Sequence, residues 1–227
     1  LSSNLFEVFI DYNGTMNTQN NDYDLCTGHS LITDKLTDLR KNSTEPEKFR
    51  SLCKQITQLL IYESTSDLAM KLTTINTPLE EMQSGKLIDR IVLVPVLRAG
   101  LIMAEAASEL LPDSTIAHLG FARDETTLKP KMYLSPNLPK SHSGIIFLLD
   151  PMLATGGTAI AACEVLKKSA AKQIVYVGIL GSKLGVYRLR EKHPDVKIRL
   201  AAIDPVINEH GYILPGLGDA GNRLFST

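Results

Sequence analysis

Short apolar runs that do not alternate with polar residues are the feature that most constrains this chain. Five such runs, rich in valine, isoleucine and leucine, are Ile91 to Leu97, Ile116 to Phe121, Gly144 to Leu149, Ile174 to Leu180 and Leu200 to Ile203. A strand with one solvated face alternates apolar and polar residues, whereas a strand covered on both faces does not. The runs therefore predict buried, mainly parallel strands.

Helical patterns lie between several of these strands, at Leu101 to Leu111, Ala159 to Lys168 and Lys183 to Lys192. Alternating strands and helices predict an α/β fold, with an open, mainly parallel sheet and helices on both faces. Ahead of the first run, apolar residues at helical spacing predict two amphipathic helices near residues 31–41 and 46–63. Ligands bind beyond the carboxyl ends of strands in such sheets, so the loops that follow the strands are the candidate sites.

Composition excludes several other classes of protein. The 227 residues are 44% hydrophobic and 22% charged, as in ordinary globular proteins. With 24 Lys and Arg against 25 Asp and Glu, the chain lacks the basic excess of a nucleic-acid binder. It has no apolar run near the ~18 residues of a membrane span and no recognisable export signal. We expect a cytoplasmic protein without a nucleic-acid or membrane partner.

The first residues differ from the rest of the chain. The stretch from Tyr12 to Asp24 is polar and has almost nothing to bury. We therefore expect an N-terminal arm at residues 1–27 and a single domain at residues 28–227.

Cysteine and histidine positions indicate neither a disulfide framework nor a zinc site. Cys26, Cys53 and Cys163 are an odd number at wide spacing, which favours a reducing compartment. Cys163 lies at helical spacing among apolar residues and is expected in the core. His118 lies within a strand pattern and is expected to be a hydrogen-bonded core histidine.

The segment after Gly144 to Leu149, here called the phosphate loop, is Asp150-Pro151-Met152-Leu153-Ala154-Thr155-Gly156-Gly157-Thr158, and a predicted helix follows it. Glycines let backbone amides approach an anion, a helix N-terminus adds partial positive charge, and threonine hydroxyls can donate. A tight strand-to-helix turn with a threonine as helix cap is the alternative, about equally supported by this motif alone. The segment is neither a Walker loop nor a dinucleotide-binding glycine motif.

Arginines follow two other predicted strands. Arg98 interrupts an apolar stretch after Ile91 to Leu97, and Arg123 comes just after Ile116 to Phe121. A charge in such a position needs a partner, which is either an internal carboxylate or an anionic ligand. Two arginines at the same edge of the sheet as the phosphate loop favour a polyanionic ligand.

The segment from Gly211 to Arg223, here called the hood loop, contains four glycines and one proline. Backbone amides and carbonyls in a rigid loop are suited to recognising the edge of a planar heterocycle. An omega loop without a ligand is the alternative.

Taken together, these motifs resemble those of uracil phosphoribosyltransferases, which have the type I phosphoribosyltransferase fold. The resemblance extends from Gly28 to Phe225 and rests on the order and spacing of five segments. They are Val94 to Gly100, Arg123 to Pro130, Asp150 to Thr158, His193 to Val196 and Gly211 to Arg223. The phosphate loop paired with this hood loop separates the chain from purine and orotate relatives.

The resemblance implies transfer of the phosphoribosyl group of 5-phosphoribosyl 1-diphosphate (PRPP) to uracil, giving UMP and diphosphate, as in pyrimidine salvage. It implies three catalytic residues, with Arg98 and Arg123 on the diphosphate and Asp150 on the ribose hydroxyls. Mg²⁺ is the implied cofactor, held through diphosphate oxygens and water and not by a set of protein ligands. The PRPP-binding residues implied by the resemblance are Arg98, Arg123, Asp150, Pro151, Met152, Leu153, Ala154, Thr155, Gly156, Gly157, Thr158 and Asp219.

The resemblance also implies how the base is bound. Uracil is expected to contact Ile213, Gly218, Asp219 and Ala220, largely through backbone atoms. Its O2 and O4 need donors and its N3–H needs an acceptor, and cytosine inverts two of these positions. Each buried mismatch costs about 1–3 kcal/mol, which is enough to exclude cytosine.

The chain departs from the family pattern at three places, and the changes at Asn222 and at Lys183-Leu184 motivate an alternative. Asn222 replaces an aspartate, Ser226 replaces a glycine, and residues 181–185 replace Ala-Ala-Pro-Glu-Gly with Gly-Ser-Lys-Leu-Gly, so that Lys183 and Leu184 stand where a proline and an acid are usual. The alternative is a catalytically weak homologue that binds uracil or UMP, or acts as a regulatory protein. We expect an active enzyme that forms a homodimer or a larger homo-oligomer, with the N-terminal helices as an interface and GTP as a candidate activator.

Overall fold

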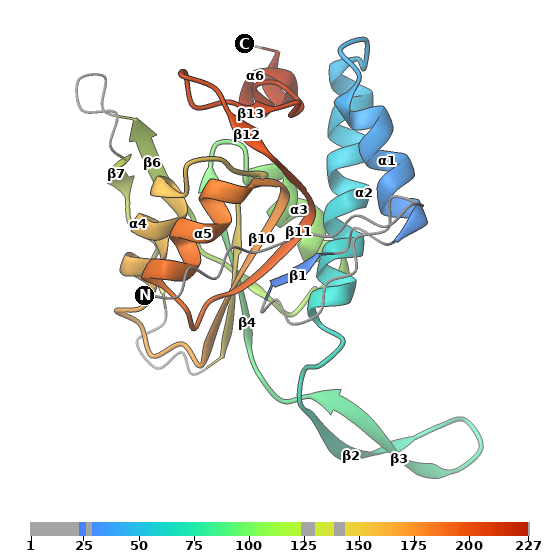
Figure 1. Cartoon of the computed structure of the whole chain (residues 1–227). Coiled ribbons are helices and arrows are strands. Elements are labelled where there is room, and N and C mark those ends of the chain that lie inside the picture. The colour runs from blue at the N-terminus through green and yellow to red at the C-terminus, as the bar shows by residue number, and fades with distance from the viewer. Residues whose placement is uncertain (1–22, 26–28, 124–129, 139–143, 227) are drawn as a thin grey trace, which may run out of the picture.

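The computed structural model describes residues 23–25, 29–123, 130–138 and 144–226. A twisted sheet lies at the centre of the molecule between two layers of helices (Figure 1). Its strand order is β1-β11-β10-β8-β4-β6-β7, and every neighbouring pair is parallel except β6 and β7. The strands are β1 (Tyr23–Leu25), β4 (Ile91–Leu97), β6 (Leu119–Arg123), β7 (Pro130–Leu134), β8 (Ile145–Leu149), β10 (Gln173–Ser182) and β11 (Lys197–Asp204).

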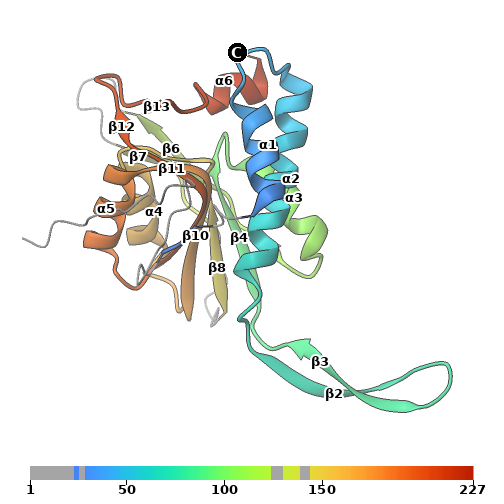
Figure 2. The same cartoon turned by 45° about the vertical axis from the view of Figure 1, so that its right-hand side comes forward.

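Helices cover both faces of this sheet, as the sequence predicts (Figure 2). On one face lie α1 (Ser30–Arg40), α2 (Pro46–Ser64) and α3 (Leu101–Leu110). On the other lie α4 (Gly157–Leu166) and α5 (Lys183–Lys192). A short helix, α6 (Ala220–Phe225), ends the described chain beside the ends of α1 and α2.

The apolar runs do not alternate with polar residues because the side chains on both faces of each strand are packed into a hydrophobic core, one on each side of the sheet. In β4, Leu93 packs toward α1, α2 and α3, while its neighbours Val92 and Val94 pack toward α4 and α5. Phe147 and Ile146 of β8 divide in the same way, and each of these side chains is almost fully buried. Burial on both faces accounts for the valine-, isoleucine- and leucine-rich composition of the runs.

The predicted elements agree with the structure within a few residues, with one run divided. The run from Ile116 to Phe121 forms a two-residue strand β5 (Thr115–Ile116) and then β6. His118 lies between them and is exposed, whereas Ala117 and Leu119 are buried. The expectation of a core histidine at position 118 was therefore wrong, because the backbone turns this residue outward. Cys163 is buried in the core as expected.

Some elements give no signal as apolar runs. The antiparallel edge strand β7 is exposed along most of its length, and β9 (Met152–Leu153), β12 (Val206–Ile207) and β13 (Ile213–Leu214) have two residues each. An antiparallel hairpin, β2 (Met70–Asn76) and β3 (Glu81–Leu87), extends away from the body of the molecule (Figure 1). Neither of its faces is covered by another described part of the chain.

Most of the predicted N-terminal arm, residues 1–22 and 26–27, lies outside the described residues. Within it, Tyr23–Leu25 pair with Ile198–Leu200 as the edge strand β1. Among the described residues, none of the helices combines the length and the apolarity needed to cross a membrane.

Candidate functional site

A crevice of about 280 Å³ lies beyond the carboxyl ends of β4, β6 and β8. Arg98 and Ala99 line it from the loop after β4, and Phe121 lines it from β6. The phosphate loop contributes the rest of the polar lining, which is Asp150, Thr155, Gly157 and Thr158. The two loops that the sequence singled out after β4 and β8 therefore meet at one cavity.

The loop after β4 is held tightly against the sheet. The Gly100 amide donates to the Val96 carbonyl at 2.9 Å. A Cβ on Gly100 would lie 2.3 Å from the carbonyl oxygen of Leu149, so no larger residue fits without moving the backbone. The peptide between Leu97 and Arg98 is cis. This packing fixes Arg98 at the mouth of the crevice, where its side chain is exposed.

The two interpretations of Arg98 are now distinguishable. The Arg98 guanidinium lies over the ring of Phe225, with Arg98 Cζ 5.6 Å from the ring centroid. None of the ion pairs recorded among the described residues includes Arg98. The exposure of the Arg98 side chain at the crevice favours an anionic ligand over an internal salt bridge.

The phosphate loop leads into α4 through a glycine and not through a threonine cap. The N-cap residue is Gly156, with φ of 81°, and no side chain caps the helix. The first amides of an α-helix have no intrahelical acceptor and carry partial positive charge. Since Gly157 and Thr158 line the crevice at this helix end, the loop has the donor arrangement of a phosphate site.

Helix α5 supports the phosphate loop from behind. The Ser182 hydroxyl donates to the Ala154 carbonyl at 2.6 Å and accepts from the Gly185 amide at 2.8 Å, which caps α5. A Cβ on Gly185 would lie 2.4 Å from the Ala154 oxygen. The departure from the family pattern at residues 181–185 thus keeps the glycine that allows this close approach and adds a serine cap.

Asp150 is the one acidic side chain that lines the crevice within the described part of the chain. Burial raises its pKa from 3.8 to about 7, and the Met152 amide, 3.3 Å from Oδ1, opposes the rise. Its backbone carbonyl accepts from the Tyr176 hydroxyl at 3.0 Å. Burial and the neighbouring Asp150 carboxylate hold the pKa of Tyr176 well above its usual value. The crevice therefore contains a carboxyl group that changes charge near neutral pH.

The remaining phosphate-loop residues predicted to bind PRPP lie behind this lining. Leu153 and Gly156 are buried, and a Cβ on Gly156 would lie 3.0 Å from the Gly185 carbonyl oxygen. Pro151 is also buried, and its carbonyl accepts from the Ile179 and Leu180 amides of β10. These residues shape the loop through their backbone.

The hood loop lies at the same end of the sheet, after β11. Ile213 and Ala220 are buried, whereas Gly218 is exposed, with φ of 79°. The Asp219 carboxylate caps α6 by accepting from the Asn222 amide at 2.8 Å, and the Tyr212 hydroxyl lies 3.4 Å from its other oxygen. Phe225, just after the hood loop, contacts Arg98, whereas Ile213, Gly218, Asp219 and Ala220 are not among the residues that line the crevice.

Arg123 ends β6, and only its backbone is described. Strands β4 and β6 are parallel neighbours with Leu97 opposite Gly120, so the chain carries Arg98 and Arg123 to the same edge of the sheet. Residues 124–129, part of a segment that carries the family resemblance, lie outside the described residues.

Three residues that the sequence did not single out also belong to this region. Arg40 and Asp204 contact the hood loop, and Phe225 contacts Arg98. Asp204 had a detectable signal, because it comes directly after the apolar run Leu200 to Ile203, as Asp150 comes after Gly144 to Leu149. Arg40 had none, since an arginine in the last turn of a helix is ordinarily solvated.

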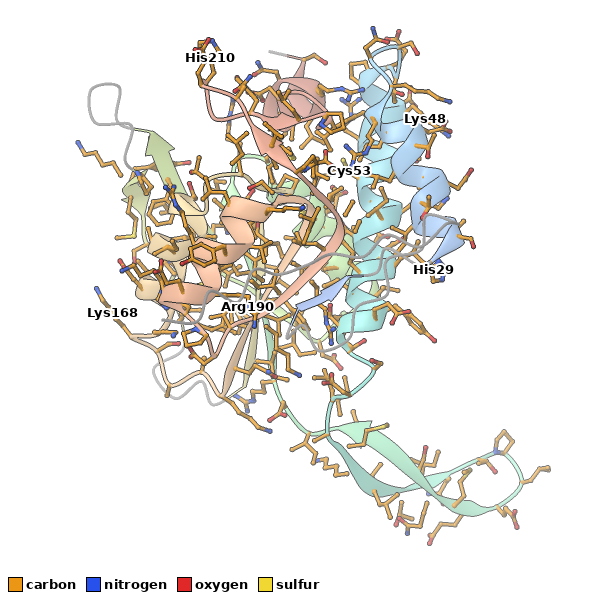
Figure 3. The ribbon with its side chains drawn as sticks, in the orientation of Figure 1. His29, Lys48, Cys53, Lys168, Arg190 and His210 are labelled. Carbon is orange, nitrogen blue, oxygen red and sulfur yellow. The ribbon has the colours of Figure 1, made fainter. Side chains whose placement is uncertain are left out.

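Other prominent side chains lie apart from the crevice. Figure 3 shows His210 at the outer tip of the loop between β12 and β13, and Lys168 near the end of α4 away from that loop. Cys53 lies on the buried side of α2, where burial raises its pKa to about 12. These groups take no part in lining the crevice.

Comparison with known proteins agrees with this geometry. The family model for uracil phosphoribosyltransferase matches residues 26–227. A uracil phosphoribosyltransferase of Roseiflexus sp. (strain RS-1) is 47% identical over 199 residues, which cover 88% of this chain and 96% of the relative. The structure of the AQ2163 protein of Aquifex aeolicus is 36% identical and superposes with a TM-score of 0.81, covering 88% of this chain and 96% of that one.

A more distant structure shares the fold alone. The adenine phosphoribosyl transferase of Trypanosoma brucei, solved with AMP, pyrophosphate and ribose-5-phosphate, is 14% identical with a TM-score of 0.54. The match covers 87% of this chain and 88% of the adenine phosphoribosyl transferase chain. The family match over nearly the whole chain and the close curated relative lead to one assignment: the chain belongs to the uracil phosphoribosyltransferase family.

Proposed function

We propose that this protein transfers the phosphoribosyl group of PRPP to uracil, giving UMP and diphosphate. The observation that carries the proposal is the crevice, where an exposed arginine, a glycine-rich helix N-terminus and the half-buried carboxyl group of Asp150 face the same space. Anion donors on two sides of a carboxyl group match a sugar that bears phosphates at both ends. The hood loop beside Arg98 supplies the place for a planar base.

In the proposed mechanism, the donors of Thr155 to Thr158 and the N-terminus of α4 hold the 5-phosphate of PRPP. Asp150 accepts hydrogen bonds from the ribose hydroxyls, and Arg98 and Arg123 bind the diphosphate. The bond from C1 of the ribose to the diphosphate breaks first, and the electron pair leaves with the diphosphate. N1 of uracil then bonds to C1, and its proton passes to the departing diphosphate or to water. Positioning and charge stabilisation supply most of the rate enhancement.

Mg²⁺ fits this site as a partner of the substrate. Among the described residues no three histidine, cysteine or acidic side chains cluster as ligands, and Asp150 is the carboxyl group that lines the crevice. Such a donor set suits an ion that keeps its waters and binds through substrate oxygens. When bound, Mg²⁺ would neutralise charge on the departing diphosphate.

The base is proposed to bind at Ile213, Gly218, Asp219 and Ala220 of the hood loop. A loop of buried apolar residues and positive-φ glycines presents backbone groups at fixed positions, which suits the donor and acceptor pattern of uracil. Asp219 already caps α6, so its carboxylate is oriented before PRPP arrives.

One assay tests the function. Purified protein is mixed with labelled uracil, PRPP and Mg²⁺, and UMP is measured by chromatography. Ribose 5-phosphate in place of PRPP is the control, since it lacks the leaving group. We expect UMP only with PRPP. Uracil binding without UMP would contradict the proposal and support a weak, base-binding homologue. The same assay with and without GTP tests activation.

The proposed homo-oligomer has its strongest support in the hairpin of β2 and β3. A two-stranded hairpin by itself is at best marginally stable in water. This one exposes apolar side chains on both faces, which is expected of an element covered by a second copy of the chain. The exposed apolar residues of the hairpin are Met70, Leu72, Ile75, Leu79, Met82 and Leu87.

A further inference from the structure

A bidentate ion pair joins α1 to the carboxyl end of β11 and holds the hood loop. Arg40 Nη1 and Nη2 donate to Asp204 Oδ2 and Oδ1, each at 2.7 Å. The Gly216 amide donates to the same Oδ2 at 2.8 Å, and Arg40 Nη1 also donates to the Gly216 carbonyl at 2.7 Å. Both backbone polar groups of Gly216 are thus held by one pair of side chains.

The pair is well shielded from water. The Asp204 side chain is 8% exposed and that of Arg40 is 25% exposed. A bidentate, charge-assisted pair has a defined geometry. Breaking it is costly, because the remaining charge would be partly desolvated and without its partner.

A second arginine holds the next residue of the loop. Arg223 Nη1 donates to the carbonyls of Leu217 and Leu39, at 2.8 and 2.9 Å, and Nη2 donates to the Lys41 carbonyl at 2.6 Å. Its guanidinium stacks on the Phe49 ring with the centroid 4.2 Å away. Figures 1 and 2 show the result, with α6 seated beside the ends of α1 and α2.

Residues 216–218 contain two glycines in the left-handed region of backbone conformation. Gly216 has φ of 66°, and a Cβ on it would lie 2.0 Å from the Ile213 carbonyl oxygen. Gly218 has φ of 79°. Glycine lowers the steric cost of these conformations but leaves the free loop with many others. The arginine contacts select one of them.

We propose that Arg40 and Asp204 are positioning residues for uracil, which hold Gly216 so that the backbone groups of Gly218 to Ala220, just after it, meet the edge of the base. The inference rests on the proposed function and deepens it. Hydrogen bonds weaken steeply with misalignment, so a loop that is fixed before binding recognises uracil better than a mobile one. Neither side chain lines the crevice, and both act through Gly216.

The test compares Asp204→Asn and Arg40→Lys with Asp38→Asn. Asp38 also lies on α1 and pairs with Lys41 at 2.6 Å, but both side chains are exposed and neither touches the hood loop. We expect the first two variants to raise KM for uracil ~10-fold and to change KM for PRPP less than ~3-fold. Asp38→Asn should leave both within ~2-fold. Discrimination between uracil and cytosine should fall with the rise in KM.

Hydrogen exchange provides a readout that does not depend on turnover. In ligand-free protein, amides of residues 212–214 and 216–219 should exchange faster in Asp204→Asn than in the wild type, while β4 and β8 stay protected. Unchanged loop exchange would overturn the proposal, as would faster exchange with unchanged KM for uracil. Equal rises in both KM values would mean a general structural role and would also overturn it.

Two safeguards keep the test decisive. If Asp204→Asn does not fold, Arg40→Lys keeps the charge and removes only the planar fork, and the same criteria apply to it. If the wild type forms no UMP, the proposed function fails, whereas the exchange experiment still shows whether the ion pair holds the loop.

Discussion

Arg90 and Arg98 flank the same strand at opposite ends, which makes them a matched pair for testing the crevice. Arg98 lines the crevice, and Arg90 is exposed ahead of β4. We expect Arg98→Ala to lower kcat/KM at least ~10²-fold, since loss of one electrostatic contact to the transition state costs about 3 kcal/mol. Arg90→Ala should change it less than ~2-fold. Steady-state kinetics measure both, and an unchanged rate for Arg98→Ala would remove Arg98 from the site.

Asp150 links activity to pH. Its pKa is raised to about 7 by burial, so the carboxylate needed to accept the ribose hydroxyls is depleted below that pH. We expect kcat/KM for PRPP to fall as the pH drops through about 7, and the residual activity of Asp150→Asn to lack this transition. A wild-type profile that is flat between about pH 6 and 8 would contradict the assignment.

The same group sets a stability difference. A carboxyl whose folded pKa lies above its unfolded value of 3.8 stabilises the fold below that value and loses this contribution as the pH rises through about 7. The difference in Tm between Asp150→Asn and the wild type should therefore be at least ~2 °C more favourable to the variant near pH 8 than near pH 4. Calorimetry at the two pH values measures the difference.

At the scale of elements, the junction of β10 with α5 determines how the phosphate loop is supported. Ser182 caps α5 and donates to the Ala154 carbonyl. Ser182→Ala should lower the free energy of unfolding by about 1–2 kcal/mol, because it removes a helix cap and leaves a carbonyl unpaired. Denaturant titration measures this loss, and Ser108→Ala, on an exposed helical site, should cost under ~0.5 kcal/mol. Equal effects would show that the cap contributes nothing.

The elements also show which patterns a sequence carries clearly. The strands β4, β8, β10 and β11 were predictable because burial on both faces demands an unbroken apolar run. The hairpin and β7 were not, because their residues are mostly exposed and follow no burial pattern, and the two-residue strands were not, because they are too short to form an apolar run. His118 was misplaced for a related reason, since a short break between β5 and β6 is invisible in an apolar run.

At the scale of the whole molecule, the exposed hairpin makes oligomeric state a direct test. Ile75 and Met82 lie opposite each other on one face of the hairpin, and Leu72 lies on the other face. We expect Leu72→Glu combined with Ile75→Glu to shift the protein toward monomers, since a charge on each face opposes burial. Sedimentation velocity measures the mass. Tyr187→Glu, at an exposed side chain of α5, is the control and should leave the mass unchanged.

Two outcomes would contradict this interface. A wild-type protein that sediments as a monomer at micromolar concentration would show that the hairpin is not covered by a second copy. An oligomer that persists in the double variant would place the interface elsewhere, with the exposed side chains of α1 and α2 as the next surface to test.

The sequence by itself determined the α/β class, the helices and strands of the core, the two loops after β4 and β8, and the family. Each of these depends on local patterns, such as burial periodicity, glycines at a strand end and ordered motif spacing, which a linear chain displays directly. The charge near zero excluded a basic nucleic-acid surface but was compatible with cations gathered at one crevice.

Only the tertiary structure decided how distant segments meet. Arg40 and Asp204 are 164 positions apart, and their pairing on Gly216 appears only once α1 packs beside β11. The pKa of Asp150 near 7 and the contact of Phe225 with Arg98 likewise depend on burial and on approach through space. Long-range hydrogen bonds and desolvation leave no local pattern in a sequence, because each arises from neighbours that folding alone brings together.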